Sequence, residues 1–214
     1  MPSQTLSLTL SRLGEVDYED ALILQREIHD GLVRGTKENT VLLLEHPSIY
    51  TAGKRTLDIE RPINGERVID VDRGGKITWH GPGQLVGYPI VRLKNPHELV
   101  GFVRTLESAL IETCAYFGIE SIRIAGRSGV WVKDEKGERK IAAIGIRVAQ
   151  GVTMHGFALN ICPDLSKFDA IIPCGISDAE VTSISRERGV AVTLEEVLPI
   201  IEVALKRFLS EVIE

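Results

Sequence analysis

Apolar residues recur at helical spacing in three parts of the chain, which predicts three amphipathic helices. The first covers residues 18–33, where charged positions separate the apolar ones. The second is expected to begin at Asn95-Pro96-His97-Glu98, with Asn95 as the cap and Glu98 closing a capping box, and to end before Gly118. The third opens at a second capping box, Thr193 with Glu196, and continues to residue 212.

Between these helices the apolar pattern is typical of β-strands. In the run 85–93, Pro89 predicts either a bulge or an edge strand, because proline cannot donate to a ladder. The polar segment 134–138 is expected to be a turn. Helices and strands are segregated along the chain, which indicates an α+β fold with a mixed, largely antiparallel sheet flanked by helices. The expected strands cover residues 40–44, 68–71, 85–93, 121–124, 129–133, 140–149 and 153–160.

Composition limits the class of protein. A chain of 214 residues, 43% hydrophobic and 26% charged, fits one globular domain spanning 1–214. Its net charge of −5 argues against general binding to nucleic acid or to an anionic membrane surface. The N-terminal residues have no basic, apolar export pattern, and no apolar run approaches the ~18 residues of a membrane span, so a cytoplasmic location is expected.

Three cysteines without CxxC spacing predict neither a disulfide framework nor a zinc site. Cys114 falls on the apolar stripe of the second helix and is expected in the core, and Cys162 is interpreted as structural. Cys174 lies outside any periodic face, between Pro173 and Gly175, which favours an exposed turn. From the residues alone, a nucleophile and a small buried side chain remain equally open for Cys174.

The segment 73–84 is rich in glycine and also carries Arg73, Trp79, His80 and Gln84, a combination more typical of a binding loop than of a plain surface loop. We expect no regular structure across it. His80 could act as a general base or brace the site by hydrogen bonding. Lys140 opens a run of small residues that leaves room for a ligand, although a lysine at a strand start is usually a solvated end residue.

Several other chemistries find no support in the sequence. Gly75-Lys76 lacks the remaining residues of a phosphate-binding loop. The glycine spacing after Gly81 does not fit a dinucleotide fingerprint, and residues 126–129 are one residue short of a nucleophile elbow. The five histidines show no metal-ligand spacing. We therefore expect no metal and no cofactor.

Six ordered motifs resemble the lipoate-biosynthesis octanoyltransferase family, whose members move an octanoyl group from acyl carrier protein to a lysine of lipoyl domains. One departure is Trp79, which stands where relatives usually carry tyrosine. The resemblance implies the fold shared by biotin and lipoate protein ligases. The motifs are residues 73–87, 126–131, 140–145, 155–160, 173–176 and 181–183.

The resemblance also implies roles for residues and partners. Cys174 would be the acyl-thioester nucleophile, and Lys140 would lower its pKa. Octanoyl-acyl carrier protein would be the donor, and the lipoyl domains of 2-oxoacid dehydrogenases and the glycine cleavage H protein would be the acceptors. The implied acyl pocket consists of Arg73, Gly74, Gly75, Lys76, Ile77, Thr78, Trp79, His80, Ala143, Ile144, Gly145, Gly156, Phe157 and Ala158.

Two alternatives remain open at this point: an ATP-dependent lipoate or biotin ligase on the same fold, and a non-catalytic acyl-binding domain. The sequence also leaves open the preferred acceptor, the oligomeric state, the chain-length preference, and whether Lys140 or His80 accepts the proton during amide formation.

Overall fold

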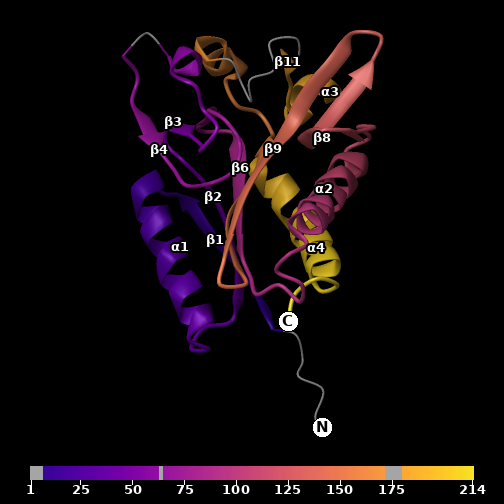
Figure 1. Cartoon of the computed structure of the whole chain (residues 1–214). Helices are drawn as coiled ribbons and strands as arrows, with labels where there is room; N and C mark the ends of the chain where they lie inside the picture. Colours follow the sequence, from indigo (N-terminus) through magenta and orange to yellow (C-terminus); the bar gives the residue numbers. More distant parts are fainter. Residues whose placement is uncertain (1–6, 63–64, 172–179) are drawn as a thin grey trace.

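A mixed eight-stranded sheet forms the centre of the molecule, in the strand order β1-β2-β6-β10-β9-β8-β7, with β11 added beside β9 (Figure 1). This computed structural model describes residues 7–62, 65–171 and 180–214. Strand β1 pairs in parallel with β2, β11 pairs in parallel with β9, and the other pairs are antiparallel. The α+β prediction with a mixed sheet is confirmed. The strands are β1 (Leu8–Glu15), β2 (Asn39–Glu45), β6 (Gln84–Ile90), β7 (Ile122–Ile124), β8 (Arg127–Asp134), β9 (Gly137–Ala149), β10 (Val152–Asn160) and β11 (Glu180–Val181).

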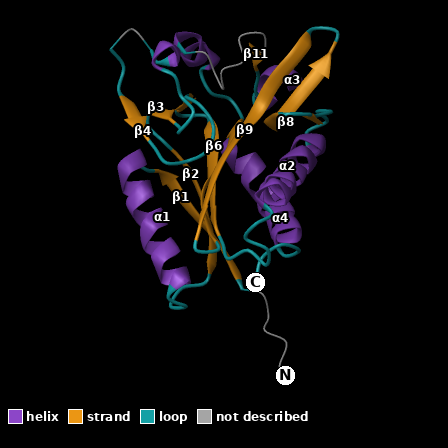
Figure 2. Cartoon of the chain, viewed as in Figure 1, coloured by secondary structure: helices purple, strands orange, loops and turns teal. Residues whose placement is uncertain are grey.

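Helices cover both faces of this sheet (Figure 2). Helix α1 (Tyr18–Val33) packs on one face, against β6 and β10, and α2 (Leu99–Tyr116) with α4 (Leu194–Leu209) packs on the other. The short helix α3 (Ile184–Arg188) and the 3₁₀ turns η1 (Asp58–Glu60) and η2 (Leu165–Ala170) complete the helical segments of the described chain. The sheet therefore separates the space under α1 from the space under α2 and α4.

The helix boundaries test the predicted caps. Helix α1 has the predicted bounds, and α4 begins with the predicted box, in which the Thr193 and Glu196 side chains each bind the other's backbone N–H. The box predicted for α2 is wrong. The Asn95 side chain accepts the His97 N–H, and the Asn95 carbonyl accepts the Glu98 N–H, so these residues form a separate turn ahead of the helix.

Most of the apolar core lies between the sheet and the α2–α4 pair, and a smaller cluster lies under α1. Cys114 is fully buried in the larger cluster, as predicted. Val130 and Val132 of β8 also face the α2–α4 side, whereas Val86, Tyr88 and Ala158 face the α1 side. The α1 side is the less filled of the two, and the cavity described below opens there.

A second sheet of three short strands sits above α1, in the order β4-β3-β5. Its strands are β3 (Ile49–Ala52), β4 (Val68–Asp70) and β5 (Thr78–His80). The short strand expected at 68–71 is confirmed. The expectation of no regular structure across 73–84 is wrong at Thr78–His80, which pairs with β3 through three residues that a glycine-rich context did not reveal.

Pro89 lies in a central strand, so the edge-strand alternative is wrong. Pairing of β6 with β10 stops at Gly87 opposite Phe157. Beyond this point the Thr153 hydroxyl donates to the Pro89 carbonyl at 2.7 Å and accepts the Val91 N–H at 3.0 Å. The Thr153 side chain thus supplies hydrogen bonds to the β6 backbone where its ladder with β10 has stopped.

We expect Thr153→Val to lower the free energy of unfolding by about 1–3 kcal/mol, because the buried Val91 N–H and Pro89 carbonyl lose their partner while side-chain volume is kept. The midpoint of urea denaturation measures this loss. Thr40→Val is the control, since the Thr40 hydroxyl bonds only the exposed Glu38 carbonyl. Equal losses in both variants would contradict the bridging role of Thr153.

Candidate functional site: a cavity between the two sheets

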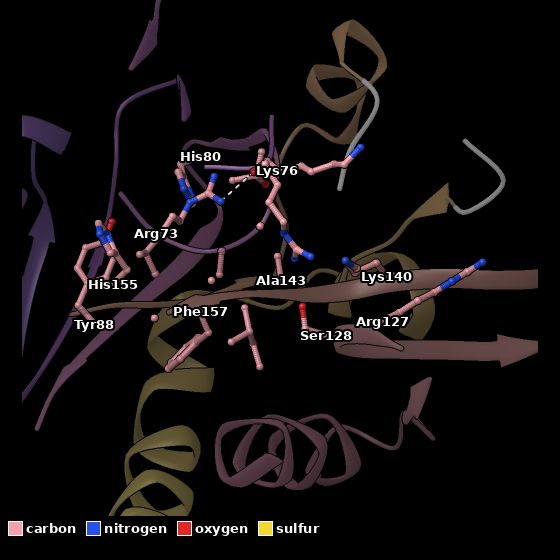
Figure 3. Close-up of a pocket in the computed structure, with 18 of the residues that line it drawn as sticks. Arg73, Lys76, His80, Tyr88, Arg127, Ser128, Lys140, Ala143, His155 and Phe157 are labelled. Carbon is pink, nitrogen blue, oxygen red and sulfur yellow. Dashed lines mark hydrogen bonds between the residues drawn. The ribbon is translucent and has the colours of Figure 1, made fainter. Parts of the chain in front are cut away.

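A cavity of about 230 Å³ lies between the α1 face of the main sheet and the small sheet (Figure 3). Strands β6, β9 and β10 provide its floor, β5 and the preceding glycine loop provide its roof, and α1 closes one end with Tyr18. Its lining residues are Tyr18, Arg55, Arg73, Gly75, Lys76, Thr78, His80, Val86, Tyr88, Gly126, Arg127, Ser128, Lys140, Ala143, Ile144, Gly145, His155, Gly156, Phe157 and Ala158.

Lys140 reaches this cavity because strand β9 contains a bulge. Trp131 pairs with Lys140, but the next residue, Val130, pairs with Ala142, so Ile141 is an extra residue in β9. Side chains alternate along a regular strand, and Lys140 would then share the face of Ala142, toward α2 and α4. With the bulge, Ile141 and Ala142 both join the core on that side, and Lys140 lies on the cavity side with Ala143 (Figure 3).

The bulge is also where β9 changes its neighbour. The β9–β10 ladder ends at Ala142 opposite Leu159, and β11 takes over with Val181 beside Lys140. Lys140 is 8% exposed, and its Nζ lies 4.6 Å from the centre of the Trp131 ring. Lys140 is therefore a buried residue within β9, and the interpretation as a solvated strand end is wrong. Its ammonium is instead held over an aromatic face, an attractive arrangement for a cation.

Alternation along β5 divides the predicted loop residues between two sides. Thr78 and His80 face the cavity. Trp79, between them, faces the opposite way, where its ring packs edge-on against Phe168 and its Nε1 donates to Ser48 at 2.9 Å. Ile77 belongs to the same small apolar cluster. Among the described residues, eleven of the fourteen predicted pocket residues line the cavity, and Gly74, Ile77 and Trp79 do not.

Arg73 braces the roof of the cavity. Its guanidinium donates to the carbonyls of Gly74, Lys76 and Thr51 and to the Thr51 hydroxyl, at 2.7–3.1 Å. A Cβ on Gly145 would lie 3.0 Å from Arg73 Cδ and from the Gly74 carbonyl oxygen, so the glycine allows β9 to pack closely against this brace. The glycine loop is thus held by buried hydrogen bonds.

His80 is part of a buried chain of hydrogen bonds. Asn160 Nδ2 donates to the Thr182 carbonyl, so its Oδ1 accepts from Gln84 Nε2 at 2.9 Å. Gln84 Oε1 then accepts from His80 Nδ1 at 2.8 Å, which leaves His80 Nε2 to accept the Thr51 hydroxyl at 3.3 Å. Both ring nitrogens of His80 are engaged, and the bracing interpretation of this residue is the one its contacts favour.

Burial sets the ionisation of the groups at this end of the cavity. Desolvation, with a smaller contribution from His46, lowers the pKa of His80 to about 3. Desolvation also raises the pKa of Tyr18 to about 12 and the pKa of Tyr88 well above its usual value. All three side chains are therefore neutral at physiological pH. The Tyr88 hydroxyl lies 2.7 Å from His46 Nε2, so these two buried polar groups at this end of the cavity are hydrogen-bonded to each other.

His155 is a lining residue that the sequence analysis did not single out. Its φ of 59° is rare for a residue with a side chain, and its Nε2 lies 2.7 Å from Asp72 Oδ1. Asp72 also forms an ion pair with Arg147. Desolvation lowers the pKa of His155 despite the adjacent carboxylate. His155 lies within β10, where its backbone N–H donates to Gln25 Oε1 at 2.9 Å and its side chain lines the cavity.

Seven further lining residues were not predicted. Arg127 and Ser128 fall within a motif of the family resemblance, and this was the only signal for them. Tyr18 and Tyr88 sit on periodic faces, where an apolar core position and a cavity wall look alike in sequence. The additional lining residues are Tyr18, Arg55, Val86, Tyr88, Gly126, Arg127 and Ser128.

The three cysteines differ in location, and the two described ones differ in exposure. Cys174, the predicted nucleophile, lies outside the described residues. Burial raises the pKa of Cys114 to about 12. Cys162 is exposed, and its pKa is raised by desolvation and then by Glu45 and Glu195. Neither described cysteine has the lowered pKa of an activated thiol.

Within residues 7–62, 65–171 and 180–214, no group of three or more histidine, cysteine or carboxylate side chains could hold a metal ion. In the same part of the chain, no helix has the length and apolar character needed to cross a membrane.

Comparison with known proteins identifies the class to which this fold and cavity belong. Residues 17–206 match the model of the lipoyl protein ligase A/B catalytic domain, and the chain belongs to that family. Within the family it is similar to the octanoyltransferases. It is 58% identical to that of Salinispora tropica, over 94% of this chain and 96% of the relative, and 56% identical to that of Mycobacterium tuberculosis, over 91% and 84%. The resemblance drawn from the motifs is confirmed.

Solved structures show the same fold at much lower identity. A bipartite lipoate protein ligase from Thermoplasma acidophilum superposes with a TM-score of 0.72 at 17% identity, covering 95% of this chain and 83% of that one. A biotin protein ligase from Aquifex aeolicus gives 0.55 at 15% identity, covering 97% and 71%. The predicted kinship with biotin and lipoate ligases is confirmed at the level of the fold.

We expect stability to fall as the pH drops from 6.5 toward 3, because the unfolded chain protonates His80 in this range and the folded chain does not. Each pH unit costs up to about 1.4 kcal/mol for one such group. His80→Gln should reduce the pH slope of the free energy of unfolding by about one proton, measured by urea denaturation between pH 4 and 6.5. His97→Gln, at an exposed position, is the control. An unchanged slope in His80→Gln would show that His80 titrates normally.

Proposed function

We propose that this protein transfers an octanoyl group from octanoyl-acyl carrier protein to a lysine of lipoyl domains, through a thioester on Cys174. The acceptors would be the lipoyl domains of 2-oxoacid dehydrogenases and the glycine cleavage H protein. The observation that carries the proposal is the convergence of separate family motifs on one cavity, with Lys140 facing it. Identity of 56–58% with octanoyltransferases supports the same reaction.

The lining of the cavity suits an acyl thioester. Val86, Ala143, Phe157 and Ala158 supply apolar surface for the hydrocarbon chain, at roughly 0.8 kcal/mol per buried methylene. The lining also contains five cationic side chains, of which Lys76 forms an ion pair with Glu60 and Arg127 forms one with Glu138. The cationic lining residues are Arg55, Arg73, Lys76, Arg127 and Lys140.

The reaction needs no external energy source. Attack of the Cys174 thiolate on the carrier thioester breaks one C–S bond and forms another, so the first step is nearly balanced. The carrier sulfur leaves as a thiolate and takes a proton from the Lys140 ammonium, which leaves Lys140 neutral for the second step. Attack by the acceptor lysine then replaces the C–S bond with an amide, which is downhill. A cationic Lys140 beside the sulfur would lower the pKa of the thiol and stabilise its thiolate.

The acceptor lysine must lose a proton before it attacks, and the contacts favour Lys140 or the departing thiolate over His80 as the acceptor of that proton. His80 has both ring nitrogens engaged and a pKa of about 3, so it binds a proton poorly at neutral pH. We assign His80 to bracing the roof of the cavity.

The position of Cys174 relative to Lys140 belongs to the proposal. Chain segments on both sides of it are anchored near the cavity: Ile171 packs in the cluster of Trp79, and Val181 pairs with Lys140. Cys114 and Cys162 have raised pKa values, which makes them poor alternatives as nucleophiles. Ligases on this fold are only 15–17% identical to the chain, so an ATP-dependent ligase has the weaker support.

Mass spectrometry after incubation with octanoyl-acyl carrier protein tests the proposal. We expect one octanoyl adduct, on Cys174, that hydroxylamine removes, because thioesters are cleaved by this nucleophile and amides are not. Cys174→Ala should give no adduct and no transfer, and Cys114→Ala should keep both while losing about 1 kcal/mol of stability. An adduct on Cys162 or Cys114, or ATP-dependent use of free octanoate, would overturn the proposal.

A further inference from the structure

Glu107 is a fully buried carboxylate on helix α2, on the opposite side of the sheet from the cavity. Its Oε1 accepts the Gly129 backbone N–H at 3.0 Å. Its Oε2 accepts from Arg104 at 2.6 Å and from Arg123 at 3.0 Å. A buried charge is costly unless it is paired and hydrogen-bonded, and these contacts satisfy it. Arg104 and Arg123 could pair with a carboxylate at the surface. The hydrogen bond to the Gly129 N–H is therefore the contact that requires a carboxylate at this buried position.

Gly129 stands on β8 at the site of the bulge. It is the residue before Val130, where the register of β8 against β9 shifts by one. Its φ of 108° lies in a region that favours glycine, and a Cβ here would lie 2.4 Å from the Ala142 carbonyl oxygen. The Gly129 N–H donates to Glu107 Oε1 from this conformation, so the carboxylate binds β8 at the residue next to the register shift.

We propose that Glu107 is a positioning residue for Lys140: by binding the Gly129 amide it fixes the β8–β9 bulge that turns Lys140 toward the cavity. The bulge leaves Ile141 unpaired and sets Trp131 directly opposite Lys140, with the ammonium over the indole ring. A carboxylate on one face of the sheet thus determines which side chain appears on the other face. The consequence for acyl transfer rests on the proposed function, whereas the placement of Lys140 does not.

The test compares Glu107→Leu, which removes the acceptor, with Leu110→Ala, which weakens the core from the same helix and leaves the Glu107–Gly129 hydrogen bond in place. Two measurements report on geometry. Protons on the Lys140 side chain near the Trp131 ring face should resonate upfield, and the Gly129 amide should exchange slowly with solvent. Glu107→Leu should lose both signatures, and Leu110→Ala should keep both. Glu107→Gln retains an oxygen acceptor and should keep most of each.

Transfer kinetics form the second arm. Glu107→Leu should lower kcat at least tenfold with little change in KM, and it should have no further effect in a Lys140→Met background, because both changes remove the same placed ammonium. If Glu107→Leu does not fold, Gly129→Ala is the second variant, because its Cβ would collide with the Ala142 carbonyl oxygen at the bulge. It should also lose the upfield shift of Lys140.

An unchanged Lys140 shift in both Glu107→Leu and Gly129→Ala would overturn the inference, as would kcat losses that multiply with those of Lys140→Met. A wild-type protein that transfers no octanoyl group would overturn the proposed function instead, and the chemical shifts and amide exchange would still decide where Glu107 places Lys140.

Discussion

The site depends on one constraint, the single extra residue in β9 at Ile141. A sheet gives each strand two faces with strict alternation, and this sheet uses one face for the core with α2 and α4. Without the bulge, Lys140 would point into that core, where an unpaired ammonium is costly to bury. With it, the same strand supplies Ile141 and Ala142 to the core and Lys140 to the cavity.

Buried polar contacts hold the roof of the cavity in place. Arg73 holds the glycine loop as a roof, and the His80–Gln84–Asn160 chain ties that roof to the Thr182 carbonyl. These groups are satisfied by one another, so they do not need to turn into the cavity for partners. Apolar side chains from β6, β9 and β10 are then left facing open space, which a hydrocarbon chain can fill.

The sequence predicted elements whose pattern is local. Helix α1 and the Thr193 box of α4 were predicted because periodicity and capping are written in adjacent residues. Strand β5 and the late start of α2 were not, since pairing with β3 and the turn at Asn95 depend on contacts that no local pattern records. The bulge at Ile141 could not be predicted either, because an extra residue in β9 is defined only by its pairing with β8. The motifs predicted most of the residues that line the cavity. That Trp79 points away from the cavity could be predicted only once β5 was known to be a strand, because side chains alternate along a strand.

Chain-length selectivity is the most direct test that this cavity is the acyl site. We expect kcat/KM for acyl-carrier donors of four to twelve carbons to peak near eight, with a loss of about 1.6 kcal/mol, roughly fifteenfold, when two methylenes are removed. Ala143→Leu, which fills part of the floor beside Lys140, should move the optimum to shorter chains. Equal kcat/KM across these lengths, or an optimum that Ala143→Leu does not move, would contradict the account.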